Sequence, residues 1–386
     1  MKKTGDLFNF RQVKRYLLGL VLLVVVSGCH TLGFYGQALK GQYQIVAHQE
    51  SIEKLEADLQ TPEKLRHRLR FLQELRQFAE QSLKLPLDGH YRKYVDVNRP
   101  YVVWNVEAAP EFSMQPKTWW YPLVGSQEYR GYFSKNGATN YAAYLRSKGY
   151  DVTVGGVEAY STLGWFKDPV LNTFIFEPDA DLAEIIFHEL GHQRVFARGD
   201  TDFNEAFATT VGEEGARRWL KAKGDQKGLD EYLAHLRRND RFVHLVMETR
   251  ARLESLYGDQ RSTDGRLSAT DKNRNVPTEK LRHQKQEIFN NMKQEYELVK
   301  VQWGEDPEYD GWFSHQLNNA HLNSVAAYYD LVPGFEQMLA ANGGDLEKFY
   351  NEVSRLAKKP KDERHAALRA LAHSNLAHTI AERPKS

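Results

Sequence analysis

The chain has 386 residues, 41% hydrophobic and 27% charged, a balance typical of soluble globular proteins. The formal net charge is only +1 and there is no basic block, which excludes nucleic acid as the main partner. This length predicts one large domain or two ordinary ones, and aromatic residues, 12% of the chain, are plentiful enough to fill a core.

The first 28 residues have the pattern of a secretory leader. Five basic residues precede the apolar run Tyr16–Val26, which is too short to span a bilayer but typical of a signal peptide. The following Val-Ser-Gly-Cys, ending at Cys29, resembles the lipobox of bacterial lipoproteins, in which the cysteine is lipidated. Cys29 is the only cysteine in the sequence, so it cannot form a disulfide bond within the chain. We therefore expect a signal peptide over residues 1–28 and a lipid anchor at Cys29; the alternative is an ordinary buried cysteine.

Residue His30, rather than an aspartate, follows the cysteine. By resemblance to lipoprotein sorting in Gram-negative bacteria, this implies a location in the cell envelope, at the periplasmic face of the outer membrane. The membrane contact expected for the mature chain is therefore the N-terminal lipid.

The mature chain, residues 29–386, is expected to form one domain in three parts. Residues 29–90 carry apolar side chains at helical spacing, interrupted by Thr61-Pro62 as a cap and first helical residue, which predicts a helical hairpin. Residues 91–222 contain short β-like runs at Tyr101–Val106 and Asp151–Val154 and a helix at Thr139–Ser147.

Two further helices end this middle part, at Asp181–Phe196 and Phe203–Leu220, joined by the loop Ala197–Asp202. Residues 223–386 are again helical, with turn-rich breaks near 262–271 and 304–310. The last predicted helices are Leu317–Tyr329 and Leu346–Ala357, before a polar tail. The fold class is therefore α+β, mostly helical with a small mixed β-sheet.

The segment His188-Glu189-Leu190-Gly191-His192 fits the pattern H-E-x-x-H within the first of these two helices. Residues four apart lie one turn above each other, so both imidazoles face the same way and can bind one Zn²⁺. Glu189 can then reach a water molecule beside the ion and act as general base. The alternative is two surface histidines beside a salt-bridging glutamate, which the apolar residues 185–187 disfavour.

A third metal ligand is needed, and Glu205 near the start of the next helix is our choice. Small residues at Ala206, Ala208 and Gly212 allow the two helices to approach closely, which brings Glu205 back towards the histidines. A first-turn glutamate that only stabilises the helix dipole is the alternative. The rival ligands are Asp200, Asp202 and Glu213. Thr209 and Glu213, at i+4 and i+8 from Glu205, suit positions that orient a ligand histidine.

These residues resemble the gluzincins, zinc peptidases in which a glutamate on the following helix completes the site, and this implies a zincin-like fold. The chain also resembles a family of bacterial lipoproteins described as predicted aminopeptidases. Two departures from better-known gluzincins are the short gap from His192 to Glu205 and Thr209 where an acidic residue is usual. The family resemblance rests on residues 34–38, 41–42, 124–125, 129–133, 159–166, 168–169, 203–208, 317–320 and 326–329.

An aminopeptidase also needs a group for the free ammonium of its substrate. Glu158, in Gly155-Gly-Val-Glu-Ala159, looks like the glutamate of the Gly-x-Met-Glu-Asn loop of zinc aminopeptidases; the alternative is a solvent-exposed turn glutamate. Tyr160, Tyr328 and Tyr329 are candidates to stabilise the oxyanion, with Tyr160 the first choice, and core packing is the alternative for each.

The sequence thus predicts a zinc-dependent metallopeptidase, an aminopeptidase with one Zn²⁺ per chain that acts on peptides and is lipid-anchored in the bacterial envelope. Two alternatives stay open: an envelope zinc endopeptidase, and a metal-binding lipoprotein without catalytic activity.

Overall fold

The computed structural model of the protein describes residues 29–121, 124–159, 167–258 and 278–381. The chain divides into two compact units, residues 1–48 and residues 49–386. In the first unit, Cys29 begins the single described helix α2 (Cys29–Ala47), and the expected signal peptide lies outside the described residues. No helix in the described part of the chain has the length and apolarity needed to cross a membrane.

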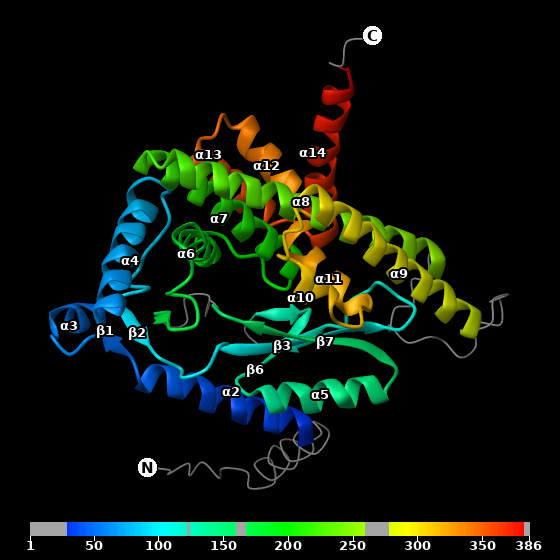
Figure 1. Cartoon of the computed structure of the whole chain (residues 1–386), viewed down its shortest axis with the longest axis horizontal. Coiled ribbons are helices and arrows are strands. Elements are labelled where there is room, and N and C mark those ends of the chain that lie inside the picture. Colours follow the sequence, from blue (N-terminus) through cyan, green and yellow to red (C-terminus); the bar gives the residue numbers. More distant parts are fainter. Residues whose placement is uncertain (1–28, 122–123, 160–166, 259–277, 382–386) are drawn as a thin grey trace, which may run out of the picture. The chain divides into compact units, whose positions relative to one another are not determined.

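The central sheet of the second unit is antiparallel and consists of β6 (Tyr129–Tyr132), β3 (Val103–Pro110) and β7 (Tyr150–Val157), with β3 in the middle. Helix α5 (Lys135–Ser147) covers one face and α11 (Asn319–Tyr329) packs against the other (Figure 1). Most residues of β3 are buried because the strand has a neighbour on both edges and a helix on both faces.

Two smaller sheets complete the β structure of the described residues. The first is mixed: β2 (Lys93–Val95) pairs antiparallel with β1 (Glu50–Ser51) and parallel with β8 (Val170–Leu171). The second is the hairpin of β4 (Trp119–Tyr121) and β5 (Gly125–Gln127). The α+β prediction is confirmed, but the strands form three small sheets where one mixed sheet is expected.

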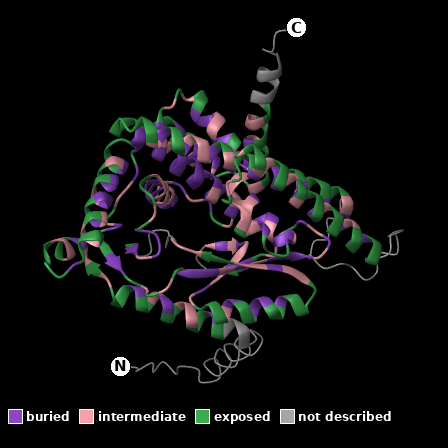
Figure 2. Cartoon of the chain, in the orientation of Figure 1, coloured by how far each residue is buried: buried purple, intermediate pink, exposed green. Residues whose placement is uncertain are grey.

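Helices supply most of the packing around these sheets. Helix α4 (Glu63–Gln81) packs on α6 (Asp179–Arg194), and α6 lies along α7 (Thr201–Lys223), with the most extensive contact between any two helices of the described residues. Figure 2 shows buried residues gathered on α6, α7 and β3, whereas the outer faces of α8 and α9 are exposed. The remaining helices are α3 (Ile52–Ala57), α8 (Gln226–Tyr257), α9 (Thr278–Gln302), α10 (Asp310–Phe313), α12 (Val332–Ala341), α13 (Leu346–Leu356) and α14 (Lys361–Ala381).

The C-terminal part differs from the sequence prediction in two helices. The sequence pattern does not predict α12, and α14 occupies residues where a polar tail is expected. Arg364 and His365 of α14 are nevertheless buried, because both bind the carboxylate of Asp200 at the start of α7. A helix held by buried ion pairs has little apolar periodicity, so hydrophobic spacing cannot reveal it.

Helix α11 is fixed to the central sheet by asparagines. The Asn318 side chain caps its N-terminus, and Asn319, fully buried, donates from Nδ2 to the carbonyl oxygens of Pro110, Glu111 and Ser113 at 3.0–3.2 Å. The backbone N–H of Asn319 also donates to Asp151 of β7. These bonds hold the N-terminal end of α11 against β7 and the end of β3.

The Asp151 carboxylate should therefore be a stability determinant, because Lys285 Nζ of α9 also lies 2.5 Å from it and both side chains are at most 15% exposed. Asp151→Ala leaves the ammonium without its counter-ion, and we expect a loss of about 3 kcal/mol in the free energy of unfolding. Urea unfolding measures it. Arg282→Gln, at the more exposed pair with Glu111, is the control and should lose less than about 1 kcal/mol; equal losses would contradict the assignment.

Candidate metal centre

The H-E-x-x-H segment lies in the second half of α6. The helix begins after Pro178, with Asp179 and Asp181 in its first turn, where negative charge is favourable. Leu182, Ile186 and Leu190 are fully buried and hold the helix against the core. His188 and His192 therefore sit one turn apart on the side that faces α7, with only 17% and 8% of their side chains exposed.

Glu205 comes from the second turn of α7. The side chain of Asp200 caps this helix by accepting a hydrogen bond from the Phe203 backbone N–H. Glycines then allow α6 and α7 to touch: a Cβ at Gly212 would lie 2.9 Å from the Glu184 carbonyl oxygen, and one at Gly191 would lie 3.3 Å from Ala208 Cα. Both distances are too short for a larger side chain without a shift, so the close approach depends on glycine.

The three side chains meet at one point. Oε2 of Glu205 lies 3.4 Å from Nε2 of His188 and 3.5 Å from Nε2 of His192, and the two imidazole centroids are 4.9 Å apart. A tetrahedral ion with bonds of about 2.0–2.1 Å separates its ligand atoms by roughly 3.4 Å. Two imidazoles and one carboxylate are also a common ligand set of catalytic zinc, in which the fourth position is left for water or substrate. The chemistry and spacing of this cluster therefore fit Zn²⁺.

The charges of the cluster favour an anionic glutamate. Burial alone would raise the pKa of Glu205, but the charge on His192 and hydrogen bonds from both imidazoles lower that pKa well below its usual range. Burial lowers the pKa of His188, which favours the neutral, metal-binding form. For His192, burial lowers the pKa, but the charge and hydrogen bond of Glu205, with the charges of Glu189 and Asp168, raise it overall. His192 therefore has to lose a proton when it binds a metal, and Glu205 supplies the negative charge that attracts a cation.

Glu189 lies beside the cluster and is almost fully buried, with 8% of the residue exposed. Its Oε2 atom has no hydrogen-bond partner among the described residues. Burial raises the pKa of Glu189 to about 8; the charge on His192 opposes this effect, and the Glu205 and Asp168 carboxylates add to it. A cation bound at the cluster would favour the ionised form of Glu189. A buried carboxylate with a free oxygen in this position is suited to accept a proton.

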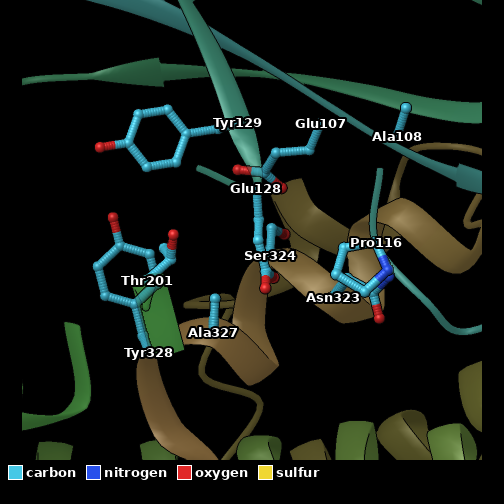
Figure 3. Close-up of a pocket in the computed structure, with 10 residues that line it drawn as sticks. All are labelled: Glu107, Ala108, Pro116, Glu128, Tyr129, Thr201, Asn323, Ser324, Ala327 and Tyr328. Carbon is cyan, nitrogen blue, oxygen red and sulfur yellow. The ribbon is translucent and has the colours of Figure 1, made fainter. Parts of the chain in front are cut away.

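Two tyrosines border the same cluster, and of these the sequence singles out only Tyr328 as a candidate site residue. The Tyr328 ring stacks on His188 with centroids 6.2 Å apart and an interplanar angle of 25°. The charge of Glu205, followed by burial, raises the pKa of Tyr328; burial, followed by Glu205, raises that of Tyr129. Both phenols therefore stay protonated and can donate hydrogen bonds. In Figure 3 the Tyr129 hydroxyl lies to the left of its ring and the Tyr328 hydroxyl at the upper end of its ring, on the same side of the view.

The rival ligands Asp200 and Asp202 lie in a different cluster. His365 Nε2 is 2.9 Å from Asp200, and Lys361 Nζ is 3.4 Å from each of the two aspartates. Arg364 Nε adds a third contact, 2.5 Å from Asp200. Their cationic neighbours already neutralise these carboxylates, so the cluster is an ion-pair network that joins α14 to α7.

Glu213 and Thr209 are buried on α7, but no described hydrogen bond joins either to a histidine of the cluster. Burial, followed by the charges of Glu184 and Glu336, raises the pKa of Glu213 to about 8. Nδ1 of His192 is buried and has no partner among the described residues. The predicted role of Thr209 and Glu213 in orienting a histidine therefore stays a prediction.

The other predicted substrate groups do not gather at the cluster. The main electrostatic neighbour of Glu158 is Glu177, and its carbonyl oxygen accepts a hydrogen bond from Thr173. Tyr329 bonds to the Asn239 side chain instead of facing the cluster. Tyr160, the preferred oxyanion candidate, lies outside the described residues.

The fold and the cluster together define an α+β protein with a buried pair of histidines and a glutamate on two touching helices. A family model described as "Putative aminopeptidase" matches residues 33–368, most of the chain. The chain therefore belongs to this family, whose description suggests a peptidase, and the predicted family resemblance is confirmed to that extent. No curated protein and no solved structure gave a match.

The assignment of Glu205 as the third ligand can be tested by zinc affinity. Glu205→Gln keeps the shape of the side chain but removes its charge. The dissociation constant for zinc should rise by more than about 100-fold, which exceeds the loss caused by mutating a residue that only orients a ligand. Competition with a chromophoric chelator gives the constant. Asp202→Asn, in the neighbouring ion-pair network, is the control and should bind zinc as the wild type does. Weakened binding in the control alone would move the site to Asp200, Asp202 and His365.

Proposed function

We propose that the protein is a zinc metallopeptidase of the gluzincin type that removes residues from the free N-termini of peptides. The observation that carries this proposal is the convergence of His188, His192 and Glu205, with Glu189 buried beside them. Three protein ligands would leave the fourth position of a tetrahedral zinc ion to water or substrate. Zinc held by these three side chains would polarise a peptide carbonyl and make a water molecule acidic near neutral pH.

Each side chain at the site then has a specific role. Glu189 accepts the proton of the attacking water and passes it to the departing amine nitrogen, so no separate acid is required. Tyr328 and Tyr129 donate hydrogen bonds to the carbonyl oxygen as it becomes negative. Both can donate because burial and the charge of Glu205 keep their hydroxyl groups protonated. Fixed donors of this kind stabilise the transition state more than the substrate.

We further propose that the mature chain is anchored in the bacterial envelope by lipid on Cys29. The support is the leader pattern of residues 1–28, the small residues before Cys29 and the lack of any second cysteine that could pair with it. A location at the periplasmic face of the outer membrane is part of the same proposal and rests on His30 after the cysteine.

The role of Glu189 as base is tested with Glu189→Gln. The amide keeps the volume of the carboxylate but cannot take a proton, so turnover should fall by at least about 100-fold while zinc stays bound. The assay is hydrolysis of a library of unblocked peptides by the zinc-loaded mature protein, read by mass spectrometry. Glu177→Gln, just before α6, is a control that should keep full activity. Chelator-sensitive hydrolysis by Glu189→Gln at the wild-type rate would reject the proposed mechanism.

The anchor is tested separately with Cys29→Ser in bacterial cells. A hydroxyl cannot form the thioether that links lipid to a lipoprotein, so the variant should lose incorporation of labelled fatty acid. Immunoprecipitation of the wild type and the variant after labelling gives the result. Equal labelling of the two proteins would exclude Cys29 as the anchor.

A further inference from the structure

A small cavity lies beside the candidate metal centre. It is about 20 Å³, room for a single water-sized group. Its walls are β3, the start of β6 and one face of α11, completed by Pro116 and by Thr201 of α7 (Figure 3). The sheet register places Glu107 of β3 directly opposite Tyr129 of β6, and positions 323, 324, 327 and 328 follow the helical repeat of α11.

Two hydrogen-bond acceptors in the lining of this cavity have no donor among the described residues. Oε2 of Glu107 and Oδ1 of Asn323 are both buried and have no hydrogen-bond partner among the described residues. Asn323 is 8% exposed, and its Nδ2 is already used by the Met114 carbonyl oxygen at 3.1 Å. Ser324 bonds to the Glu107 carboxylate but leaves Oε2 free. Buried acceptors are normally paired, so the cavity is suited to a ligand that brings several N–H donors.

Two carboxyl groups lie close together in the lining of the cavity. Glu128 lies next to Glu107, and burial, followed by the Glu128 charge, raises the pKa of Glu107 to about 8. Among the described residues, Glu128 forms an ion pair with Lys361, whose Nζ lies 3.5 Å away and also lies 3.4 Å from both Asp200 and Asp202. Glu107 has no cation of its own, so a positively charged group would be stabilised there.

The cavity and the metal centre share two walls. Tyr129 and Tyr328 line the cavity, yet the pKa of each is also raised by Glu205, and Tyr328 stacks on His188. In Figure 3 both hydroxyl groups lie on the left of the view, whereas Glu107 and Asn323 lie on the right. The side chains of Tyr129 and Tyr328 thus border both the cavity and the metal centre.

We propose that this cavity binds the α-ammonium group of a peptide whose first carbonyl lies at the metal centre, with Glu107 as counter-ion and Asn323 Oδ1 as a second acceptor. The inference rests on the proposed metallopeptidase function and adds the group that would restrict it to free N-termini. It replaces Glu158, the candidate from the sequence, which has no described contact with the cluster.

Size and reach both favour an α-ammonium over a cationic side chain. The cavity accepts one water-sized group, which an ammonium matches and a guanidinium exceeds. In a peptide the α-nitrogen is two bonds from the first carbonyl carbon, so both can lie within one small site. A lysine ammonium is separated from that carbonyl by four more carbons and would need a longer channel.

Binding of small hydroxamates tests the proposal without turnover. L-alanine hydroxamate carries a metal-binding group and an α-ammonium, whereas propionohydroxamate lacks the ammonium. Calorimetry with the zinc-loaded mature protein should show L-alanine hydroxamate binding about 10- to 100-fold more tightly, as expected for charged hydrogen bonds. N-acetyl-L-alanine hydroxamate should lose this advantage. A wild-type protein that binds all three equally would overturn the amine site and leave the metal centre intact.

Matched variants then locate the site. Glu107→Gln should bind L-alanine hydroxamate no better than propionohydroxamate, with zinc content and propionohydroxamate affinity unchanged; unchanged values also show that the variant is folded. Glu158→Gln should keep the wild-type preference. Loss of the preference in Glu158→Gln but not in Glu107→Gln would overturn the proposal.

Two further outcomes have separate meanings. If Glu107→Gln weakens binding of 6-aminohexanohydroxamate but not of L-alanine hydroxamate, the cavity binds a side-chain cation and the proposal is wrong. If the zinc-loaded wild type binds no hydroxamate at all, the proposed metal centre itself fails, and the amine site fails with it.

Discussion

The contact between α6 and α7 is the constraint on which the rest of the site depends. Two histidines one turn apart need a third ligand, and a closely packed second helix supplies it from a rigid position. Gly191 and Gly212 make this possible, because any larger side chain would meet the backbone of the opposite helix. The cluster is thus a consequence of packing, and its ligands need no flexible loop to hold them.

The sequence predicts this part of the site well because the relevant distances are local. Helical spacing aligns His188 with His192, and a short loop limits where Glu205 can lie. The amine cavity is different: Glu107, Tyr129 and Asn323 come from β3, β6 and α11, more than 200 residues apart from first to last, and only tertiary structure brings them together. Glu107 is one polar residue in a mostly buried strand, and no motif marks it.

The prediction for α14 fails because the burial of this helix depends on charge. The α+β class and the helices around the motif follow from hydrophobic periodicity. Helix α14 is instead held by the contacts of Arg364 and His365 with Asp200, and its many charged residues have the sequence pattern of a solvated tail. The same network explains why Asp200 and Asp202 do not join the histidines, although they precede Glu205. Proximity in sequence misleads here because the carboxylates already have cationic partners.

X-ray absorption at the zinc edge of the zinc-loaded mature protein tests the central claim most directly. The account predicts one ion with four nitrogen or oxygen neighbours at about 2.0–2.1 Å and outer-shell scattering from two imidazole rings. Scattering from a single imidazole would indicate the Asp200–Asp202–His365 cluster instead. A six-coordinate ion with oxygen neighbours only, or no zinc uptake, would contradict a catalytic centre formed by α6 and α7.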